Sequence, residues 1–578
     1  MTQTFRTPRG PGQGTGIAWR SWNADTFGEA ERRDRPILLC LTAVWCESCA
    51  RMDRTTYADP AVTALLGDEF VPVRVDTDWY PHVQDRYIAG GWPTTAFLTP
   101  TGEVLWAGTF VETGQFLSVA RAILTAWEDR RSELQIEMDR RRKAMEAARS
   151  RQSAIGLVRR EAADDVLSAA HETFDARNGG FGQAPKFPQP SAIEMLLVLG
   201  WRTGNPDWIA MAEQTLDGML AGELWDAGAG GFHRYALDAD WTRARTEKLL
   251  ETNAALMRAY ALGAKARGRA DWRSVAESTA TWVERTLRRS DGLYGGSIAA
   301  DPAWVGGNGV SAADPVAYTD GNALWIRALA DAGGWFGRGD WVQRAADALD
   351  TLLDVMRAPD DALYHFLPPD GLPAVTGLLT DFVETGAACL AVAQATGRAE
   401  YIEHARRLAR AMEHTLWAPG GGFYDFPSSP TDPGALRYPD RPFEMNAEAA
   451  RFLLDLALAT GERGYRAIAE RTLALLSPLA GRYGVAGAGF ALAVEEFFDP
   501  PYQVVIVGND DTAGELRRAA LSLQEPGGRV WTLEKGGRIG QSEYPPQDGG
   551  AAYLCRARSR SRPVRLPDDL LAAASAAR

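Results

Sequence analysis

The sequence contains little cysteine. An odd number of scattered cysteines does not form a disulfide framework, so we do not expect a small cross-linked secreted protein. A soluble, reducing compartment such as the cytoplasm fits this usage best. In such a compartment, a close pair of cysteines is more often catalytic or metal-binding than structural. The five cysteines in 578 residues are Cys40, Cys46, Cys49, Cys389 and Cys555.

Long apolar runs and long basic runs are also absent. No apolar stretch approaches the length of a membrane span, and residues 1–16 hold no apolar core of a secretory signal. The net charge is −13, and the basic cluster at residues 139–152 is mixed with acids and small residues, as on a solvated helix face. We therefore expect neither a membrane nor a nucleic acid as a partner. No Ser-His-Asp order, P-loop or GxGxxG motif stands out, and no cofactor is expected.

What is present indicates a large globular protein. A length of 578 residues predicts two to four structural units, and 46% hydrophobic with 24% charged residues is an ordinary globular composition. Nineteen tryptophans is a high count. They favour large helical cores, although surfaces that stack carbohydrate rings are the alternative explanation.

The first part of the chain has an alternating pattern that predicts an α/β domain over residues 15–127. A continuous apolar run, as in a doubly covered parallel strand, begins the pattern. Helical periodicity then breaks near Pro60, where a stop or kink is expected. A charged helical connector follows at residues 128–152. The predicted order is β-α-β-α-β-β-α, with strands at 36–42, 70–76 and two within 94–110, and helices at 47–66, 82–89 and 114–127.

From about residue 155 the pattern contains helices only, and it repeats. A small residue followed by an aromatic one opens each unit, near residues 181, 232, 294, 364 and 423. A polar loop, an apolar helix ending in glycine and a second helix follow. About twelve helices between 155 and 498 predict an all-α (α/α)6 toroid over residues 153–499, with the long loops on one face. Residues 500–578 return to a strand and helix pattern and predict a small α/β appendage, so the fold class is multidomain.

Several motifs together resemble a known family. They are WCESC, VPVRVDTDWYPHVQDRYIAGGWPTTAFLTPTGEVLWAGTF, GGFGQAPKFPQP, GGFHRYALDADW and GGFYDF. The combination is similar to the thioredoxin-domain proteins of the spermatogenesis-associated kind, from about residue 17 to the end. The resemblance implies a thioredoxin-like domain fused to a six-hairpin-glycosidase-like toroid. It implies fold more than function, because the family has no settled reaction.

The sequence also departs from that family. Its members usually flank the two cysteines with His or Trp, whereas Glu47, Ser48 and Ala50 stand here. The family stretch PHFEKMLYDN is ARTEKLLETN in this chain, which places Arg245 at the usual His position and Thr252 at the Asp position. The resemblance therefore implies the shape of the toroid rather than its chemistry.

Cys46 and Cys49 are the main catalytic candidates, with Trp45 directly before them. The spacing of three places both thiols on one face of the first turn of a helix. The N-terminus of that helix favours a thiolate, so Cys46 would be the nucleophile and Cys49 the resolving thiol. In the thioredoxin-like plan, Pro93 is a cis proline that faces the cysteines and brings the backbone of Trp92 against the substrate disulfide.

Two features oppose this redox interpretation. Thioredoxin-like strands often carry a buried acid six residues before the first cysteine, and Cys40 occupies that position here. Glu47 between the cysteines would oppose thiolate formation. An inert relic is therefore an alternative. A structural zinc site is less expected, because it needs about four ligands and no second CxxC or CxxH occurs. We expect no metal.

The toroid offers a second set of candidates at loop–helix junctions. Toroids of this kind usually handle a sugar with two carboxylates, one as acid and the other as base or nucleophile. Each candidate also has a structural explanation, such as an N-cap for Asp320 and Asp381, a loop carbonyl for His233, or a mutual ion pair for Arg245 and Glu247. The substrate-binding candidates, with Trp92, are Lys186, His233, Asp238, Arg245, Glu247, Asp320, Asp381, Asp425 and Glu444; Asp240 is considered beside Asp238.

Three functions follow from these observations. The leading hypothesis is a thiol–disulfide redox protein whose toroid binds a disulfide-bearing protein client or a small carbohydrate-like ligand. The second is a carbohydrate-active enzyme, a glycoside hydrolase or a sugar epimerase, that uses toroid carboxylates. The third is a binding or scaffold protein without chemistry.

Overall fold

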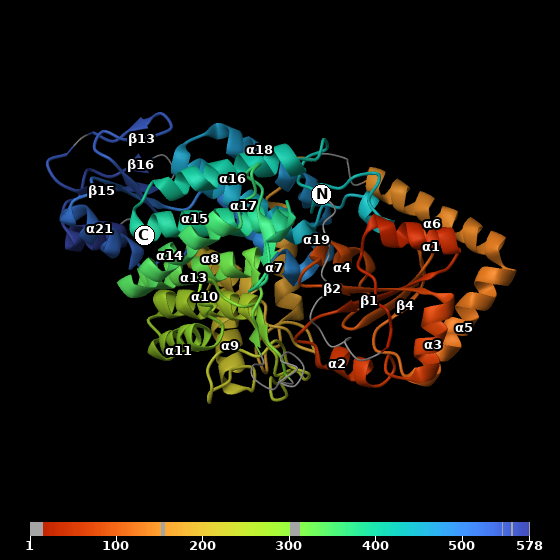
Figure 1. The fold of residues 1–578 in the computed structure, drawn as a ribbon. Coiled ribbons are helices and arrows are strands. Elements are labelled where there is room, and N and C mark those ends of the chain that lie inside the picture. The colour runs from red at the N-terminus through yellow and green to blue at the C-terminus, as the bar shows by residue number, and fades with distance from the viewer. Residues whose placement is uncertain (1–15, 152–155, 301–312, 546, 557–558, 577–578) are drawn as a thin grey trace. The chain divides into compact units, whose positions relative to one another are not determined.

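The computed structural model describes residues 16–151, 156–300, 313–545, 547–556 and 559–576 (Figure 1). Two compact units account for the chain. The appendage belongs to the second unit, and two segments inside the predicted toroid belong to the first, which differs from the predicted boundaries. The first unit is Met1–Ser153, Ser297–Asp314 and Asp425–Asp440, and the second is Ala154–Gly296, Pro315–Tyr424 and Arg441–Arg578.

The first unit is built on a four-stranded sheet with the order β2-β1-β3-β4. β1 is parallel to β2 and antiparallel to β3, which is antiparallel to β4. Every residue of β1, β2 and β3 is buried, as the continuous apolar runs predicted. The strands are β1 (Ile37–Thr42), β2 (Val71–Asp76), β3 (Thr94–Leu98) and β4 (Val104–Gly108).

The helices of this unit follow the predicted order, with one addition before β1. The expected break near Pro60 is a boundary between two helices, because the Asp59 side chain accepts the backbone N–H groups of Ala61 and Val62 and Pro60 occupies the first helical position. The helices are α1 (Ala24–Arg33), α2 (Glu47–Arg54), α3 (Pro60–Glu69), α4 (Pro81–Tyr87), α5 (Thr113–Asp129) and α6 (Arg131–Arg151).

Residues 425–440 pack on α4, which explains why they belong to the first unit. The Tyr87 hydroxyl accepts the Ala435 N–H at 2.7 Å and donates to the Gly102 carbonyl at 2.9 Å. A Cβ on Gly102 would lie 2.4 Å from the Cα of Gly434, and both glycines have positive φ. Only glycine allows this close approach of two backbones.

The second unit contains the predicted (α/α)6 toroid (Figure 1). Each inner helix packs against the next, and α20 packs against α8, which closes a ring. The inner helices are α8 (Pro190–Thr203), α10 (Leu250–Arg267), α13 (Thr319–Phe336), α15 (Leu379–Thr396), α17 (Phe443–Thr460) and α20 (Ala488–Phe498). The outer helices are α7 (Glu161–Thr173), α9 (Pro206–Ala221), α11 (Ala270–Thr286), α14 (Gly339–Val355), α16 (Glu400–Leu416) and α18 (Arg463–Leu476).

The repeated aromatic residue has a structural role in three of the units. An asparagine in the first turn of α10, α13 and α17 accepts the aromatic residue's N–H at 2.6–2.8 Å and donates to its carbonyl at 3.0 Å. These aromatic side chains are fully buried, so they seal the helices and are not available to stack a sugar. The pairs are Phe232 with Asn253, Tyr294 with Asn322, and Phe423 with Asn446.

Two inner helices extend further than the glycine pattern predicted. α10 continues through Gly263, and α13 continues through Gly333, to left-handed caps at Gly268 and Gly337. Both interior glycines lie against tryptophans of the following helix, where a Cβ would be about 3 Å from Trp272 or Trp341. Close helix packing, rather than helix termination, therefore explains these two glycines.

The appendage lies at the carboxyl ends of the inner helices within the second unit. Its sheet has the order β12-β11-β15-β16, and the Val530 N–H donates to the Gln394 side chain of α15 at 3.0 Å. The predicted strands and helix are confirmed as β11 (Gln503–Val507), α21 (Asp511–Leu521), β12 (Arg529–Leu533) and β15 (Ala551–Arg556), followed by β16 (Ser559–Arg560) and α22 (Pro567–Ala576).

Short elements complete the described chain. They are β5 (Lys248–Leu249), β6 (Ser297–Ile298), β7 (Ala313–Asp314), β8 (Ala317–Tyr318), β9 (Tyr364–Leu367), β10 (Ala374–Thr376), η1 (Gly434–Arg437), η2 (Ser477–Leu479), α19 (Ala480–Tyr483), η3 (Gly484–Gly487), β13 (Arg538–Ile539) and β14 (Ser542–Glu543). Among the described helices, none combines the length and the apolar character needed to cross a membrane.

Candidate functional sites

The two cysteines of WCESC lie at the start of α2, as the spacing predicted. They are joined by a disulfide, with their Cα atoms 5.3 Å apart. Cys46 is the N-cap residue, and its Sγ accepts the backbone N–H of Cys49 at 3.1 Å. The helix N-terminus therefore directs an N–H group and the positive end of its dipole toward the first sulfur.

The disulfide is almost fully buried, and the residue before it, Trp45, packs against Trp92. Cys46 is 5% and Cys49 is 2% exposed. The ring centroids of Trp45 and Trp92 are 5.3 Å apart in an edge-on arrangement. The indole N–H of Trp45 donates to Asp78 at 2.8 Å. The Trp92–Pro93 peptide is cis, as the family resemblance implied.

The residues behind the disulfide differ from the usual thioredoxin-like arrangement. Cys40 is buried, and burial raises the pKa of its thiol to about 11. The nearby ionised groups are instead Asp53, one turn after Cys49 on α2, and Arg74 of β2, whose closest side-chain atoms are 2.6 Å apart. Both are buried. The sequence did not point to this ion pair, because its members come from different elements.

A second buried acid lies at the carboxyl end of β2. Asp76 pairs in register with Thr42, the last residue of β1. The chain continues from this end of β1 to Cys46. Burial and the neighbouring Asp314 raise the pKa of Asp76 to about 7. The carboxyl-terminal end of β2 thus carries a carboxyl group whose pKa is near neutral.

In the toroid, three candidate ligand side chains gather at the amino ends of the inner helices. Asp320 is in the first turn of α13, Asp381 is in the first turn of α15, and His365 is on β9. One nitrogen or oxygen atom from each lies within 4.8 Å of those of the other two. The His365 Nδ1 is 3.0 Å and 3.2 Å from the two Asp381 oxygens. The predicted N-cap roles are wrong, because Tyr318 and Leu378 occupy the N-cap positions.

Several carboxyl groups are influenced by the charge of Asp320. Burial raises the pKa of Asp381 to about 6, and Asp320 contributes to this although His365 opposes it. Loss of hydration and the charge of Asp320 raise the pKa of Glu251 to about 6. Burial is also the main cause that raises the pKa of Glu384 to about 7, with contributions from Glu448 and Asp320. We call Asp320, His365 and Asp381 the Asp–His–Asp cluster.

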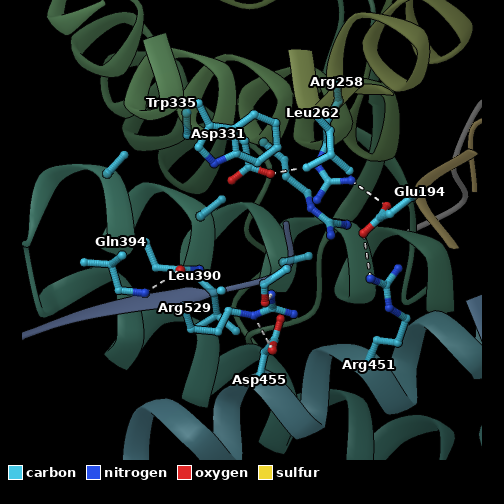
Figure 2. Close-up of a pocket in the computed structure, with 18 of the residues that line it drawn as sticks. Glu194, Arg258, Leu262, Asp331, Trp335, Leu390, Gln394, Arg451, Asp455 and Arg529 are labelled. Carbon is cyan, nitrogen blue, oxygen red and sulfur yellow. Dashed lines mark hydrogen bonds and ion pairs between the residues drawn. The ribbon is translucent and has the colours of Figure 1, made fainter. Parts of the chain in front are cut away.

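A cavity of about 70 Å³ lies between the inner helices, and its lining includes Glu384, which follows Asp381 by three residues on α15. Figure 2 shows that charged side chains from several helices converge on it. Glu194 pairs with Arg258 at 2.6 Å and with Arg451 at 2.8 Å, while Arg529 of the appendage pairs with Asp455 at 2.7 Å. The two arginines hold the pKa of Glu194 well below its usual range.

Lys186 lies inside the second unit rather than at a rim. It is 0% exposed. Its ammonium group donates to the Asp175 carboxylate at 2.6 Å and to the carbonyls of Gly179 and Ala239 at 2.8 Å and 2.7 Å. All three of its protons are used within the protein, so the predicted ligand contact is corrected to a structural role.

The candidates between residues 233 and 247 hold their own loop together. The His233 Nδ1 lies 2.8 Å from the Glu223 carbonyl, and burial lowers its pKa. Glu247 is buried, 3.7 Å from Arg234. The Arg245 N–H donates to the Tyr235 carbonyl. Asp238 and Asp240 accept hydrogen bonds from Thr242, and Asp238 also accepts from Arg243, so both acids make contacts within a turn.

Asp425 and Glu444 do not join the Asp–His–Asp cluster. Asp425 belongs to the first unit, where its carboxylate pairs with both terminal nitrogens of Arg86 at 2.8 Å and 3.0 Å. Both side chains are buried, so the Asp425 carboxylate is not accessible to a sugar. Glu444 is exposed in the first turn of α17. Partial loss of hydration, together with the charge of the nearby Glu448, raises the pKa of this carboxyl group.

The sequence predicted Asp320 and Asp381 but missed His365 and Glu384. His365 stands within ALYHF, which had been interpreted only as the opening of a repeat. Glu384 follows Asp381 by three residues on an otherwise apolar helix, which was the available signal for an acid facing the toroid interior.

These features define a class of protein, namely a thioredoxin-like CxxC domain followed by an (α/α)6 toroid with a small α/β appendage. Residues 12–146 match the family described as "Protein of unknown function, DUF255". The chain is 30% identical over 309 residues to spermatogenesis-associated protein 20 of Homo sapiens, a match that covers 50% of this chain and 39% of that protein. The predicted resemblance is confirmed.

A second relative is an uncharacterized protein of Caenorhabditis elegans, 29% identical over 264 residues, which covers 42% of this chain and 36% of that protein. The chain thus spans less than half the length of these curated relatives. Among solved structures, D-mannose isomerase has a TM-score of 0.47 at 14% identity, covering 58% of this chain and 96% of its own. A sugar epimerase from a ruminal bacterium has a TM-score of 0.45 at 15% identity, covering 54% of this chain and 84% of its own.

Proposed function

We propose that the protein is a thiol–disulfide oxidoreductase whose reactive group is the Cys46–Cys49 pair. The observation that carries this proposal is the N-cap position of Cys46, where its sulfur accepts the Cys49 N–H at 3.1 Å. The same N–H and the helix dipole stabilise a thiolate when the pair is reduced. A purely structural disulfide has no need of this placement.

The exchange begins with the reduced pair. The Cys46 thiolate attacks one sulfur of a client disulfide, and the other client sulfur leaves as a thiolate. Cys49, after losing its proton, attacks the Cys46 sulfur of the mixed disulfide and releases the second client thiolate. The client gains two electrons, and Cys46–Cys49 becomes the disulfide. A dithiol reductant must then restore the reduced pair.

The surrounding side chains support selection of a client rather than open access. Trp45 and Trp92 form an aromatic edge beside the disulfide, and backbone around a proline at this place can align an extended peptide. Because Cys46 is only slightly exposed, we expect a partner that inserts a narrow segment bearing a disulfide. The toroid would bind another part of the client or a small carbohydrate-like ligand.

The test measures reduction of a peptide disulfide by the full chain in the presence of dithiothreitol. We expect turnover that disappears in Cys46→Ser. The matched control is Cys389→Ser, which changes a buried cysteine of α15 in the toroid. Equal turnover in the wild type and in Cys46→Ser would reject the proposal.

A second candidate function is a carbohydrate-active enzyme. The specific observation is that Asp320 and Asp381, two carboxylates predicted for this role, lie together with His365 at one end of the toroid. Two nearby carboxylates can supply an acid and a base or nucleophile for glycoside chemistry.

A panel of glycans and reducing sugars tests this candidate. Hydrolysis or epimerisation that is lost in Asp320→Asn supports it, and no turnover of any member counts against it. If neither disulfide nor sugar turnover is found, the scaffold hypothesis is favoured.

A further inference from the structure

We propose that the Asp–His–Asp cluster is a binding site for a divalent transition-metal ion such as Zn²⁺. The three side chains come from α13, β9 and α15, and their candidate ligand atoms all lie within 4.8 Å of one another. One imidazole nitrogen with two carboxylates is a donor set that such ions accept. Three protein ligands would leave a coordination position open for a small molecule.

Two members of the cluster are already spaced as neighbouring ligands. His365 Nδ1 lies 3.0 Å and 3.2 Å from the Asp381 oxygens. Zinc–nitrogen and zinc–oxygen bonds of about 2.0–2.2 Å place adjacent ligand atoms a little over 3 Å apart. In the absence of an ion, a proton between these atoms supports their contact. Metal binding would replace that proton and release it to solvent.

An independent observation comes from Glu384, one turn further along α15. Its side chain faces the cavity between the inner helices and is 7% exposed, and among the described residues its Oε2 has no hydrogen-bond partner. A buried carboxylate oxygen without a partner is costly unless a positive group or a proton compensates it. A cation bound by Asp381, one turn earlier on the same helix, would help to offset this cost.

The charge balance of the surroundings favours a cation. The charge of Asp320 acts on the carboxyl groups of Glu251, Asp381 and Glu384, and Glu448 also acts on Glu384. The opposing groups are Arg234 near Glu251, His365 beside Asp381, and Arg327 and Arg451 near Glu384. A dication would favour the ionised carboxylates.

The inference does not depend on the redox function, and it deepens the carbohydrate candidate, on which its catalytic meaning rests. With an ion bound, Asp320 and Asp381 would be ligands rather than free acid and base. The ion could then polarise a hydroxyl or carbonyl oxygen of the ligand. Ion binding is measured without any sugar, so failure of the metal site and failure of the carbohydrate activity can be told apart.

The experiment uses the full chain carrying Cys46→Ser and Cys49→Ser, so that the CxxC thiolates cannot bind the probe. After chelator treatment, calorimetry with Zn²⁺ should show one ion per chain, with proton release that differs between buffers. Co²⁺ should give visible absorption bands without a thiolate charge-transfer band.

Substitution of a ligand should weaken binding by more than the roughly 10–100-fold that second-shell changes cause. The variants are His365→Gln and, because His365 is buried and its loss could prevent folding, the half-buried Asp320→Asn. Glu444→Gln is the matched control, because Glu444 is the second residue of α17 as Asp320 is of α13. Its affinity should equal that of the parent. Absence of one-to-one binding, or equal affinity in Asp320→Asn and the parent, would overturn the site.

Discussion

The two candidate sites differ in how the chain assembles them. Cys46 and Cys49 are three residues apart, and a single helix start positions both. The Asp–His–Asp cluster draws on residues 320, 365 and 381, which only the closed ring of helices brings together. A local site can be recognised from spacing, whereas a site assembled by tertiary structure has no spacing to recognise.

The sites also differ in how charge is managed. At the cysteines, the N-terminus of α2 directs an N–H group toward Cys46, which would stabilise the thiolate that the proposed exchange requires. At the toroid cluster, burial and neighbouring acids oppose the anions and raise the pKa of Asp381 and Glu384. On these proposals, the first site would favour an anion, whereas the second would favour protons or a cation.

The largest expected effect separates the two cysteines. In Cys49→Ser, Cys46 can still attack a disulfide but cannot be resolved, so a mixed disulfide with a peptide should accumulate. In Cys46→Ser, it should not form. The physical reason is that lowering a thiol pKa by one unit gives about tenfold more thiolate when the pKa lies above the ambient pH. Mass spectrometry of the adducts measures this, and equal adduct formation by both variants would contradict the assignment of Cys46 as nucleophile.

The next effect tests whether Asp425 is structural, in contrast to the Asp–His–Asp cluster. Asp425→Ala leaves Arg86 buried without its carboxylate, which should cost about 3–5 kcal/mol. Hydrogen exchange of β1 and β3 reports the opening free energy of the first unit.

The control is Arg33→Ala, which removes a partly exposed pair with Glu29 and should cost less than about 1 kcal/mol. A similar cost for both variants would show that the buried pair contributes no more than a surface pair.

The smallest of the three effects concerns Glu384 in metal-free protein. Its pKa is about 7 in the folded state and near the ordinary 4.5 when unfolded, so the folded state binds the proton more tightly. Stability should therefore fall as pH rises from about 4.5 to 7, by roughly 3 kcal/mol at most from this group. Glu384→Gln should flatten that dependence.

Hydrogen exchange of α15 at pH 5 and pH 7.5, corrected for intrinsic exchange rates, measures the change in opening free energy. Glu470→Gln is the control, because Glu470 is exposed on α18 of the same unit and its substitution should leave the pH dependence unchanged. An identical pH profile in wild type and Glu384→Gln would show that Glu384 is not the titrating group.

Much of the fold could be predicted, because the patterns that specify it are local. Apolar runs identified β1, β2 and β11, and glycine after an apolar helix identified the ends of α15 and α17. The exceptions have tertiary causes. Gly263 and Gly333 serve helix packing, and residues 425–440 join the first unit through Arg86 and Tyr87.

The sites were predicted less completely for the same reason. Asp320 and Asp381 could be proposed from their places at helix starts. His365 lies in a short strand, and its side chain contacts Asp381, which is 16 residues away in the sequence. Lys186 shows the opposite error. A lysine in a rigid polar–aromatic loop suggested a ligand contact, and three internal acceptors instead hold it in the interior.

The most direct test of the central claim is the reduction potential of the Cys46–Cys49 pair, measured in the full chain by equilibration with defined thiol–disulfide buffers. The account predicts a reversible two-electron transition between about −270 and −120 mV, the range spanned by catalytic dithiols. A value below about −300 mV, as in structural disulfides, would contradict it.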